Sequence, residues 1–139
     1  MSGAIDIWCN IFTPDGIKKY YLDVEEMRFA FQGKLAANLQ GYSPKEFLRV
    51  LDEAGIGKVI IPNAKHRSFL KQELHWNISI EEVASIIEHD PSRFIGIYGV
   101  NPFTRMEGVR ELERAVKEYG FKGAHVHASA TQRPRSSVQ

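Results

Sequence analysis

The sequence predicts an α/β fold made of parallel β/α units, and three observations support this prediction. Short apolar runs alternate with segments in which apolar residues recur every three or four positions, the period of a helix face. Strand-helix-strand order of this kind gives parallel strands joined by right-handed crossovers. The third observation is a repeated Ser/Thr-x-x-Glu pattern, typical of a helix start, at matching places in three successive units: Ser43 with Glu46, Ser79 with Glu82, and Thr104 with Glu107.

The first expected strand, Ala4 to Cys9, has bulky residues on both faces, as in a strand covered on both sides. Alternate residues share a face, so Asp6, Trp8 and Asn10 point the same way. A long connection rich in aromatic residues, 11–42, follows, and it is expected to hold an irregular helix within 23–39. Two interpretations of this connection stay open. It is either an extra packing segment or the lid or wall of a pocket.

Three further units are expected in order. Helices are predicted over 43–54, 79–87 and 104–119, and strands over 58–62, 94–100 and 121–127. The polar stretch 65–77 is expected to be a loop, with His66 and His75 at the surface, and His89 is expected to be exposed as well. Residues 1–128 are predicted to form one domain. Residues 129–139 have the composition of a disordered tail.

Composition excludes several classes of protein. The 139 residues carry a formal net charge of +1, whereas a nucleic-acid-binding protein needs a concentrated basic surface. No apolar run approaches the length of a membrane span, and the start of the chain lacks a signal-peptide pattern. The single cysteine, Cys9, excludes an internal disulfide and is expected to be a buried structural thiol. These features predict a cytoplasmic protein without nucleic-acid or membrane partners.

Polar residues follow the expected strands, at the edge where parallel α/β folds bind their ligands. His125 and His127 lie two positions apart on one strand face, a spacing that suits a transition metal or proton transfer. Three asparagines follow expected strands: Asn10, Asn63 and Asn101. They have an alternative interpretation as ordinary turn residues. The sequence contains no GxGxxG motif and no phosphate-binding loop. The candidates are Asn10 and His125 for catalysis, Trp8, Asn63 and Asn101 for substrate binding, and His127 for a metal.

Three segments, IDIWCN, FIGIYGVNP and GVRELERAVKEYGFKGAHVH, resemble the amidohydrolase-related proteins. This branch of the metal-dependent barrel enzymes includes aminocarboxymuconate-semialdehyde decarboxylase and the resorcylate decarboxylases. The resemblance covers roughly residues 4–128 and is most specific at 119–123. It implies a (β/α)8 barrel with a divalent metal, usually zinc, at the strand ends. It also implies hydrolysis of C–N or C–C bonds, or decarboxylation of small aromatic and unsaturated acids.

Two departures from the family pattern shape the prediction. The family's first strand reads I-D-x-H-x-H, and this sequence has Trp8 and Asn10 where the two histidine ligands would stand. Tryptophan cannot ligate zinc, and an amide oxygen is a poorer ligand than imidazole. We therefore expect no tightly bound zinc, and His127 is the metal ligand that the resemblance offers. The second departure is length, because an eight-unit barrel needs about 250 residues.

The sequence thus predicts the N-terminal half of a TIM-type barrel, from a truncated metal-dependent hydrolase or decarboxylase of a small organic acid. Whether the chain is itself an enzyme stays open. One alternative is a non-catalytic fragment or a small-molecule binding module. Another is an open, flavodoxin-like sheet that folds by itself. Because four strands cannot close a barrel, the chain is also expected to pair with a second copy as a homodimer or to be poorly soluble.

Overall fold

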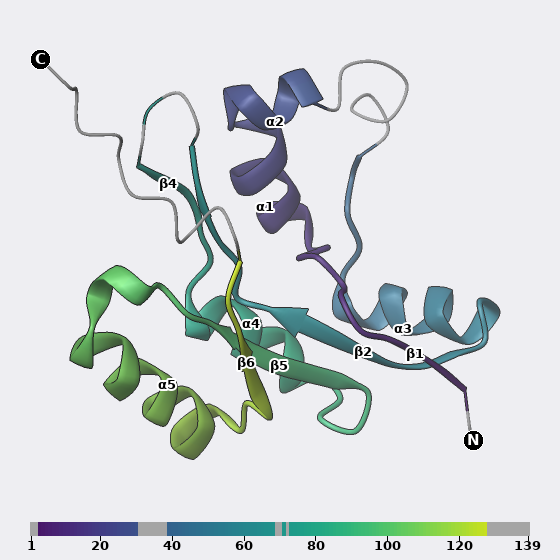
Figure 1. Cartoon of the computed structure of the whole chain (residues 1–139). Helices are drawn as coiled ribbons and strands as arrows, with labels where there is room; N and C mark the ends of the chain where they lie inside the picture. The colour runs from purple at the N-terminus through teal and green to yellow at the C-terminus, as the bar shows by residue number, and fades with distance from the viewer. Residues whose placement is uncertain (1–2, 31–38, 69–70, 72, 128–139) are drawn as a thin grey trace, which may run out of the picture.

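The computed structural model describes residues 3–30, 39–68, 71 and 73–127. The expected tail lies outside these residues, as do residues 31–38 of the expected helix within 23–39. The described chain forms a four-stranded parallel sheet in the order β1-β2-β5-β6. The sheet is half of a barrel, as predicted, and it is shown in Figure 1. Its strands are β1 (Ala4–Asp6), β2 (Ile56–Pro62), β5 (Phe94–Gly99) and β6 (Gly123–His125).

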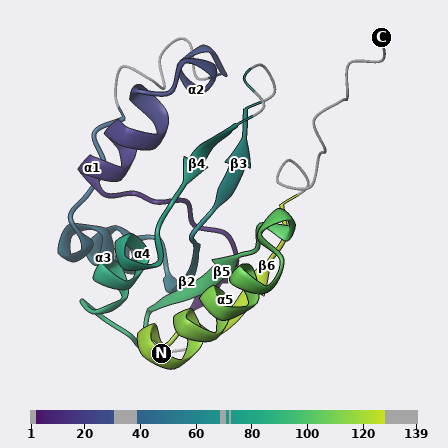
Figure 2. The ribbon, with the colours of Figure 1, turned by 90° about the vertical axis from the view of Figure 1, so that its left-hand side faces the viewer.

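Three helices connect the strands: α3 (Pro44–Glu53), α4 (Ile80–Ile87) and α5 (Met106–Tyr119). Figures 1 and 2 show α4 and α5 next to each other beside the sheet, and Arg114 of α5 bonds Glu81 of α4 at 2.7 Å. Val59 of β2 and Phe94 of β5 are adjacent in register and fully buried. Burying each side chain of this size stabilises the fold by about 1.5–3 kcal/mol. Their neighbours in register, Ile60 and Ile95, are only half-buried.

Two of the predicted helix starts are confirmed. Glu46 N donates to Ser43 Oγ, and Ser43 N donates back to Glu46 Oε2 at 2.9 Å. Ser79 and Glu82 exchange the same two bonds at the start of α4. Each pair satisfies two backbone donors that a helix N-terminus leaves free, and this is why the pattern was informative.

The third predicted helix start, at Thr104, is wrong. The chain forms a 3-10 helix, η3 (Pro102–Thr104), whose first turn is capped by Asn101, and the Thr104 hydroxyl donates to Asn101 O at 2.7 Å. Helix α5 begins only at Met106, after Arg105 adopts φ 49°, and no side chain caps it. The Asn101-Pro102 pair therefore starts the turn earlier than the Thr-x-x-Glu pattern suggested.

The prediction of a buried strand from Ala4 to Cys9 is also wrong. β1 has three residues, and the side chains of Ile5 and Ile7 are 57% and 74% exposed. β1 is an edge strand that pairs only with β2 among the described residues. After Asp6 the backbone bends, and Trp8 N donates to Asp6 Oδ1 at 3.0 Å. Cys9 N still donates to Ile60 O at 2.8 Å, so the segment stays attached to β2.

The stretch 65–77, predicted as a loop, contains an antiparallel hairpin of β3 (Lys65–Arg67) and β4 (Leu74–Asn77). His66 pairs in register with Trp76, whose ring is buried. The expectation that His66 and His75 lie at the surface is therefore wrong, because both are half-buried. The mostly polar composition of β3 concealed this strand. His89 is exposed, as predicted.

The aromatic connection packs against this hairpin. It forms α1 (Pro14–Ile17), a π-helix η1 (Lys18–Leu22) and α2 (Glu25–Ala30), and Figures 1 and 2 show these helices beside β3 and β4. Trp76 Nε1 donates to Tyr20 O at 2.5 Å, and the Tyr20 hydroxyl donates to Glu82 Oε2 at 2.7 Å. The described part of the connection thus packs between the hairpin and α4. Among the described residues, no helix has the length and apolar character that crossing a membrane requires.

Candidate functional site

A group of four aromatic side chains lies at the carboxyl ends of β1 and β6. We call Trp8, His66, His125 and His127 the rim cluster. The ring centroids of Trp8 and His125 are 4.8 Å apart with an interplanar angle of 86°, and those of Trp8 and His127 are 6.4 Å apart. The centroids of His66 and His127 are 3.8 Å apart. The hairpin therefore brings a third histidine to the pair predicted from the sequence.

The bend after β1 orients Trp8. Its backbone N–H is held by Asp6, and its ring Nε1 donates to Asn10 Oδ1 at 2.9 Å. The side chain is 38% exposed, so part of the ring stays accessible to solvent. Asn10, predicted as catalytic, therefore lies beside the rim cluster and fixes the position of the Trp8 ring.

His125 is half-buried, and its ring makes no polar contact with the described part of the chain. Both ring nitrogens, Nδ1 and Nε2, are inaccessible to solvent, and neither has a hydrogen-bond partner among the described residues. Burial, followed by the charge of His127, lowers the pKa of His125. At neutral pH its ring is therefore uncharged and offers one N–H donor and one nitrogen acceptor. Buried polar atoms in folded proteins are nearly always bonded, so an unbonded ring calls for an explanation.

His66 has the most strongly shifted pKa in the rim cluster. Burial lowers it to about 4, with smaller contributions from the charges of His127, His75 and His125. His66 is consequently neutral at pH 7. Sequence analysis missed His66 because it lies on a strand that was predicted as a loop. The signal that the sequence offered was a histidine and a tryptophan, His66 and Trp76, placed to pair across a short hairpin.

The other two predicted asparagines occupy different positions. Asn63 is fully buried, and its Oδ1 accepts from Gly99 N at 2.5 Å, which ties β2 to β5. A Cβ on Gly99 would lie 2.3 Å from Asn63 O and 3.1 Å from His125 Cε1. Gly99 therefore lies between Asn63 and the rim cluster. Asn101 does not approach the cluster in any observed contact, and its Oδ1 accepts from Phe103 N in the turn of η3.

The residues that the structure describes at this edge do not fit a resident metal ion. Among the described residues, no group of three or more His, Cys, Asp or Glu side chains is arranged to hold one. The Asn10 Oδ1 atom already accepts from Trp8, and Asp6 Oδ1 accepts from the Trp8 backbone. Cys9 is buried, as predicted, and burial, with a smaller contribution from Asp6, raises its thiol pKa to about 12. It is therefore a poor nucleophile and a poor metal ligand at neutral pH.

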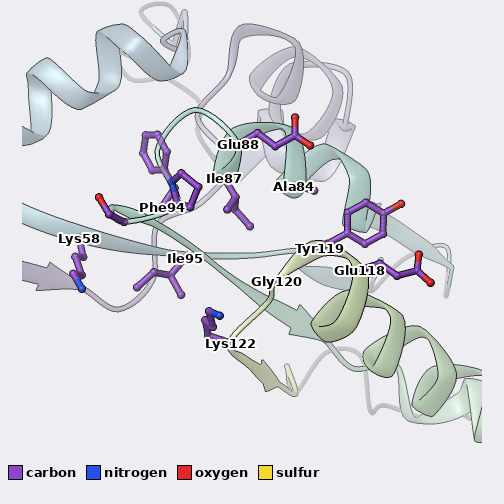
Figure 3. Close-up of a pocket in the computed structure, with 12 residues that line it drawn as sticks. Lys58, Ala84, Ile87, Glu88, Phe94, Ile95, Glu118, Tyr119, Gly120 and Lys122 are labelled. Atoms are coloured by element: carbon purple, nitrogen blue, oxygen red, sulfur yellow. The ribbon is translucent and has the colours of Figure 1, made fainter.

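A larger hollow lies at the opposite end of the strands, near the starts of β2 and β5 (Figure 3). It has a volume of about 520 Å³ and carries two lysines and two glutamates, Lys58, Lys122, Glu88 and Glu118. The side chains of both lysines are exposed. No histidine or cysteine lines this hollow. In barrel folds, residues at the amino-terminal face generally contribute to stability and not to catalysis. The rim cluster is therefore the better candidate site.

Comparison with known proteins gives matches only among solved structures. No protein-family model matches the sequence, and no curated protein matches it. A dihydroxybenzoic acid decarboxylase from Polaromonas, solved with manganese and 2-nitroresorcinol, is 26% identical with a TM-score of 0.56. The match covers 91% of this chain and 39% of that enzyme.

Two further decarboxylases match in fold. A 2,6-dihydroxybenzoate decarboxylase from Rhizobium is 20% identical with a TM-score of 0.57, covering 91% of this chain and 39% of that one. A 5-carboxyvanillate decarboxylase from Novosphingobium aromaticivorans, solved with manganese and a nitrobenzoic acid ligand, is 20% identical with a TM-score of 0.64. That match covers 94% of this chain and 43% of the enzyme. The chain thus spans about two fifths of the length of the decarboxylases it matches.

Proposed function

We propose, from the structural match of this chain to part of the amidohydrolase-related aromatic acid decarboxylases, that its rim cluster binds a small aromatic carboxylic acid. The reaction class that this kinship supports is decarboxylation of the acid, with hydrolysis as the wider alternative in the family. One observation carries the proposal. An indole ring and three imidazole rings converge at the carboxyl edge of a parallel sheet, where such folds bind their substrates.

Each ring has a chemical role in this proposal. The partly exposed Trp8 ring offers an apolar surface on which an aromatic substrate packs. His125 has a buried donor and a buried acceptor. These can pair with the carboxylate and hydroxyl groups of a hydroxybenzoic acid once the side chains that cover them, the Trp8 ring among them, move aside. Binding would satisfy polar atoms whose burial without a partner is costly. His66 and His127 form the adjoining wall.

A resident metal has no place in this proposal. Manganese is present in two of the matched decarboxylases, where a divalent ion can polarise and orient an acid. In this chain Trp8 and Asn10 bond to each other, and the described residues supply no set of three ligands. We therefore propose that acid binding does not depend on metal and that the 139-residue chain does not turn the acid over unaided.

Calorimetric titration with 2,6-dihydroxybenzoate in the presence of EDTA tests the binding step. We expect saturable binding by the wild-type chain and at least a tenfold loss of affinity in His125→Gln. His89→Gln, a matched change at an exposed histidine, should bind as the wild type does. Cyclohexanecarboxylate, which lacks the aromatic ring, should bind more weakly. Equal affinity in His125→Gln and the wild type would refute the proposed site.

A second candidate function is metal-dependent decarboxylation, and the manganese-bound matches favour it. His127 and His66, whose ring centroids are 3.8 Å apart, are the nitrogen donors that such an activity would use. Release of carbon dioxide from 2,6-dihydroxybenzoate, measured with and without added manganese, separates the two candidates. Manganese-dependent turnover that His127→Ala abolishes would establish the second. Metal-independent binding without turnover would establish the first.

A further inference from the structure

A small cavity lies between the hairpin, the end of β5 and the first turns of α5. Its volume is about 170 Å³, and none of its lining residues belongs to the rim cluster. Tyr98 contributes from the buried face of the sheet, the face that also carries Phe94. The polar groups that matter here come from the hairpin, β5 and α5: Lys65, Asn77, Tyr98, Glu107 and Glu111.

Lys65 provides a positive charge on the hairpin side. Its Nζ donates to Asn77 Oδ1 at 2.6 Å and to Ile78 O at 3.0 Å. An ammonium group has three N–H donors, and the third has no partner among the described residues. Burial lowers the pKa of Lys65, and the charge of Glu111 is the first of those that oppose the shift. The lysine is thus held at the cavity wall with one donor available.

Tyr98 provides an independent indication of a ligand. The residue is 4% exposed and lines the cavity, and its hydroxyl has no hydrogen-bond partner among the described residues. The hydroxyl is therefore free to bond a polar ligand that enters the cavity.

The opposite wall is negative. Glu107 and Glu111 lie on successive turns of α5, and both line the cavity. Glu111 Oε1 accepts from Arg114 Nη2 at 3.2 Å, whereas Glu107 is exposed. The lining of this small space therefore holds one ammonium group, two carboxylates and one neutral hydroxyl.

We propose that this cavity binds a small zwitterionic α-amino acid. Its carboxylate accepts from Lys65 and Tyr98, and its ammonium group lies against Glu107 and Glu111. A simple acid would be repelled by the two glutamates, and a simple amine would leave the Lys65 donor unpaired. The cavity is below the roughly 300–1,000 Å³ of sites for drug-sized ligands, so the amino acid has a short side chain, as in glycine, alanine or serine.

Titration of the chain with glycine and alanine, followed by NMR chemical-shift changes, tests this inference. Acetate and methylamine, which each carry one of the two charges, are the comparison ligands. We expect saturable shifts with both amino acids and at least tenfold weaker binding of acetate and methylamine. Lys65→Met should abolish binding, and Glu107→Gln should weaken it severalfold. Lys117→Met, at an exposed lysine of α5 that pairs with Glu113, is the matched control and should bind normally.

Two outcomes would overturn the inference. Acetate binding as tightly as glycine would indicate a plain anion site, and no saturable shift in the wild type would indicate a cavity that holds only water. Tyr98→Phe removes a single oxygen and keeps the ring, so it tests the site even if Lys65→Met fails to fold. The His125→Gln variant should bind glycine normally. Failure of the rim-cluster proposal would therefore leave this one intact, and the reverse also holds.

Discussion

The ring of Trp8 lies edge to face against the ring of His125, with centroids 4.8 Å apart, although the two residues belong to opposite edges of the sheet. Trp8 follows β1 and His125 ends β6, and β2 and β5 lie between them. The sheet must curl strongly for these edges to approach. The contact therefore reports the barrel-like curvature directly and holds the two edges together at the rim.

Removing this contact should destabilise the fold. We expect Trp8→Ala to lower the free energy of unfolding by about 1–2 kcal/mol, because an aromatic pair contributes about 0.5–1.5 kcal/mol beyond its buried area. Trp8→Phe keeps a ring at the position and should cost less. Urea denaturation of both variants measures the difference. A Trp8→Ala chain as stable as the wild type would show that the ring contact does not support the curl.

Acid should destabilise the chain partly through His66. Its folded-state pKa of about 4 lies below the ordinary value of 6.5, so the unfolded chain binds the extra proton first as the pH falls. The stability that neutral His66 contributes is therefore complete above pH 6.5 and is lost between 6.5 and about 4. We expect the pH profile of unfolding to be flatter in His66→Gln than in the wild type over this window. Superimposable profiles would contradict the buried, neutral state of His66.

Asn63→Ala should cost far more stability than Asn101→Ala. The first change removes the acceptor of Gly99 N at a fully buried position, and an unpaired buried donor costs about 1–3 kcal/mol. The second removes one bond in a partly exposed turn. Thermal unfolding of the two variants gives the comparison. Equal losses would mean that the Asn63 bond between β2 and β5 has no special role.

Purified chain should contain no stoichiometric zinc after dialysis. The physical reason is that Trp8 and Asn10 bond to each other and that the described residues lack a set of three ligands. Elemental analysis measures the metal content. About one zinc per chain would contradict the prediction, and in that case His127→Ala should lose the metal whereas His89→Ala should retain it.

The chain should associate with a second copy. Ile5 and Ile7 near one edge of the sheet, and Val126 beyond the other, are each more than half exposed. Exposed apolar surface of this kind favours association. Sedimentation over a range of concentrations should show a dimer or larger species, and Ile7→Lys should weaken it. A monomer at every concentration with cooperative unfolding would favour the open, independently folded sheet.

The order of the four strands of the parallel sheet and of the three helices that connect them could be predicted from the sequence, because local signals and periodicity agreed. The bonds between Ser43 and Glu46 show why such patterns predict helix starts: both partners are close in the chain, so the bonds depend on local sequence alone. The exposure of Ile5 in β1 and of Ile7 just after it could not be foreseen, because it depends on which strands surround them. Apolar composition alone does not distinguish an edge strand from a central one.

The candidate site was predicted in part for the same reason. Trp8 and Asn10 follow β1, and His125 and His127 lie at and just after the end of β6, so the shared edge of the parallel strands brings them together. His66 needed the hairpin, and the Asn63 bond to Gly99 needed the exact register of β2 and β5. These depend on contacts between distant segments, which leave no local pattern. The roles assigned to the predicted site residues remain predictions.

The rim cluster is divided between two bodies. Trp8, His125 and His127 follow the four-stranded sheet, whereas His66 belongs to a separate two-stranded sheet held by the Trp76–Tyr20 bond. Local opening in proteins tends to follow such structural units. Amide hydrogens of the hairpin should therefore exchange with solvent together, and at a rate different from those of β2 and β5. The spacing of His66 and His127 would then vary with hairpin motion while the sheet stays intact.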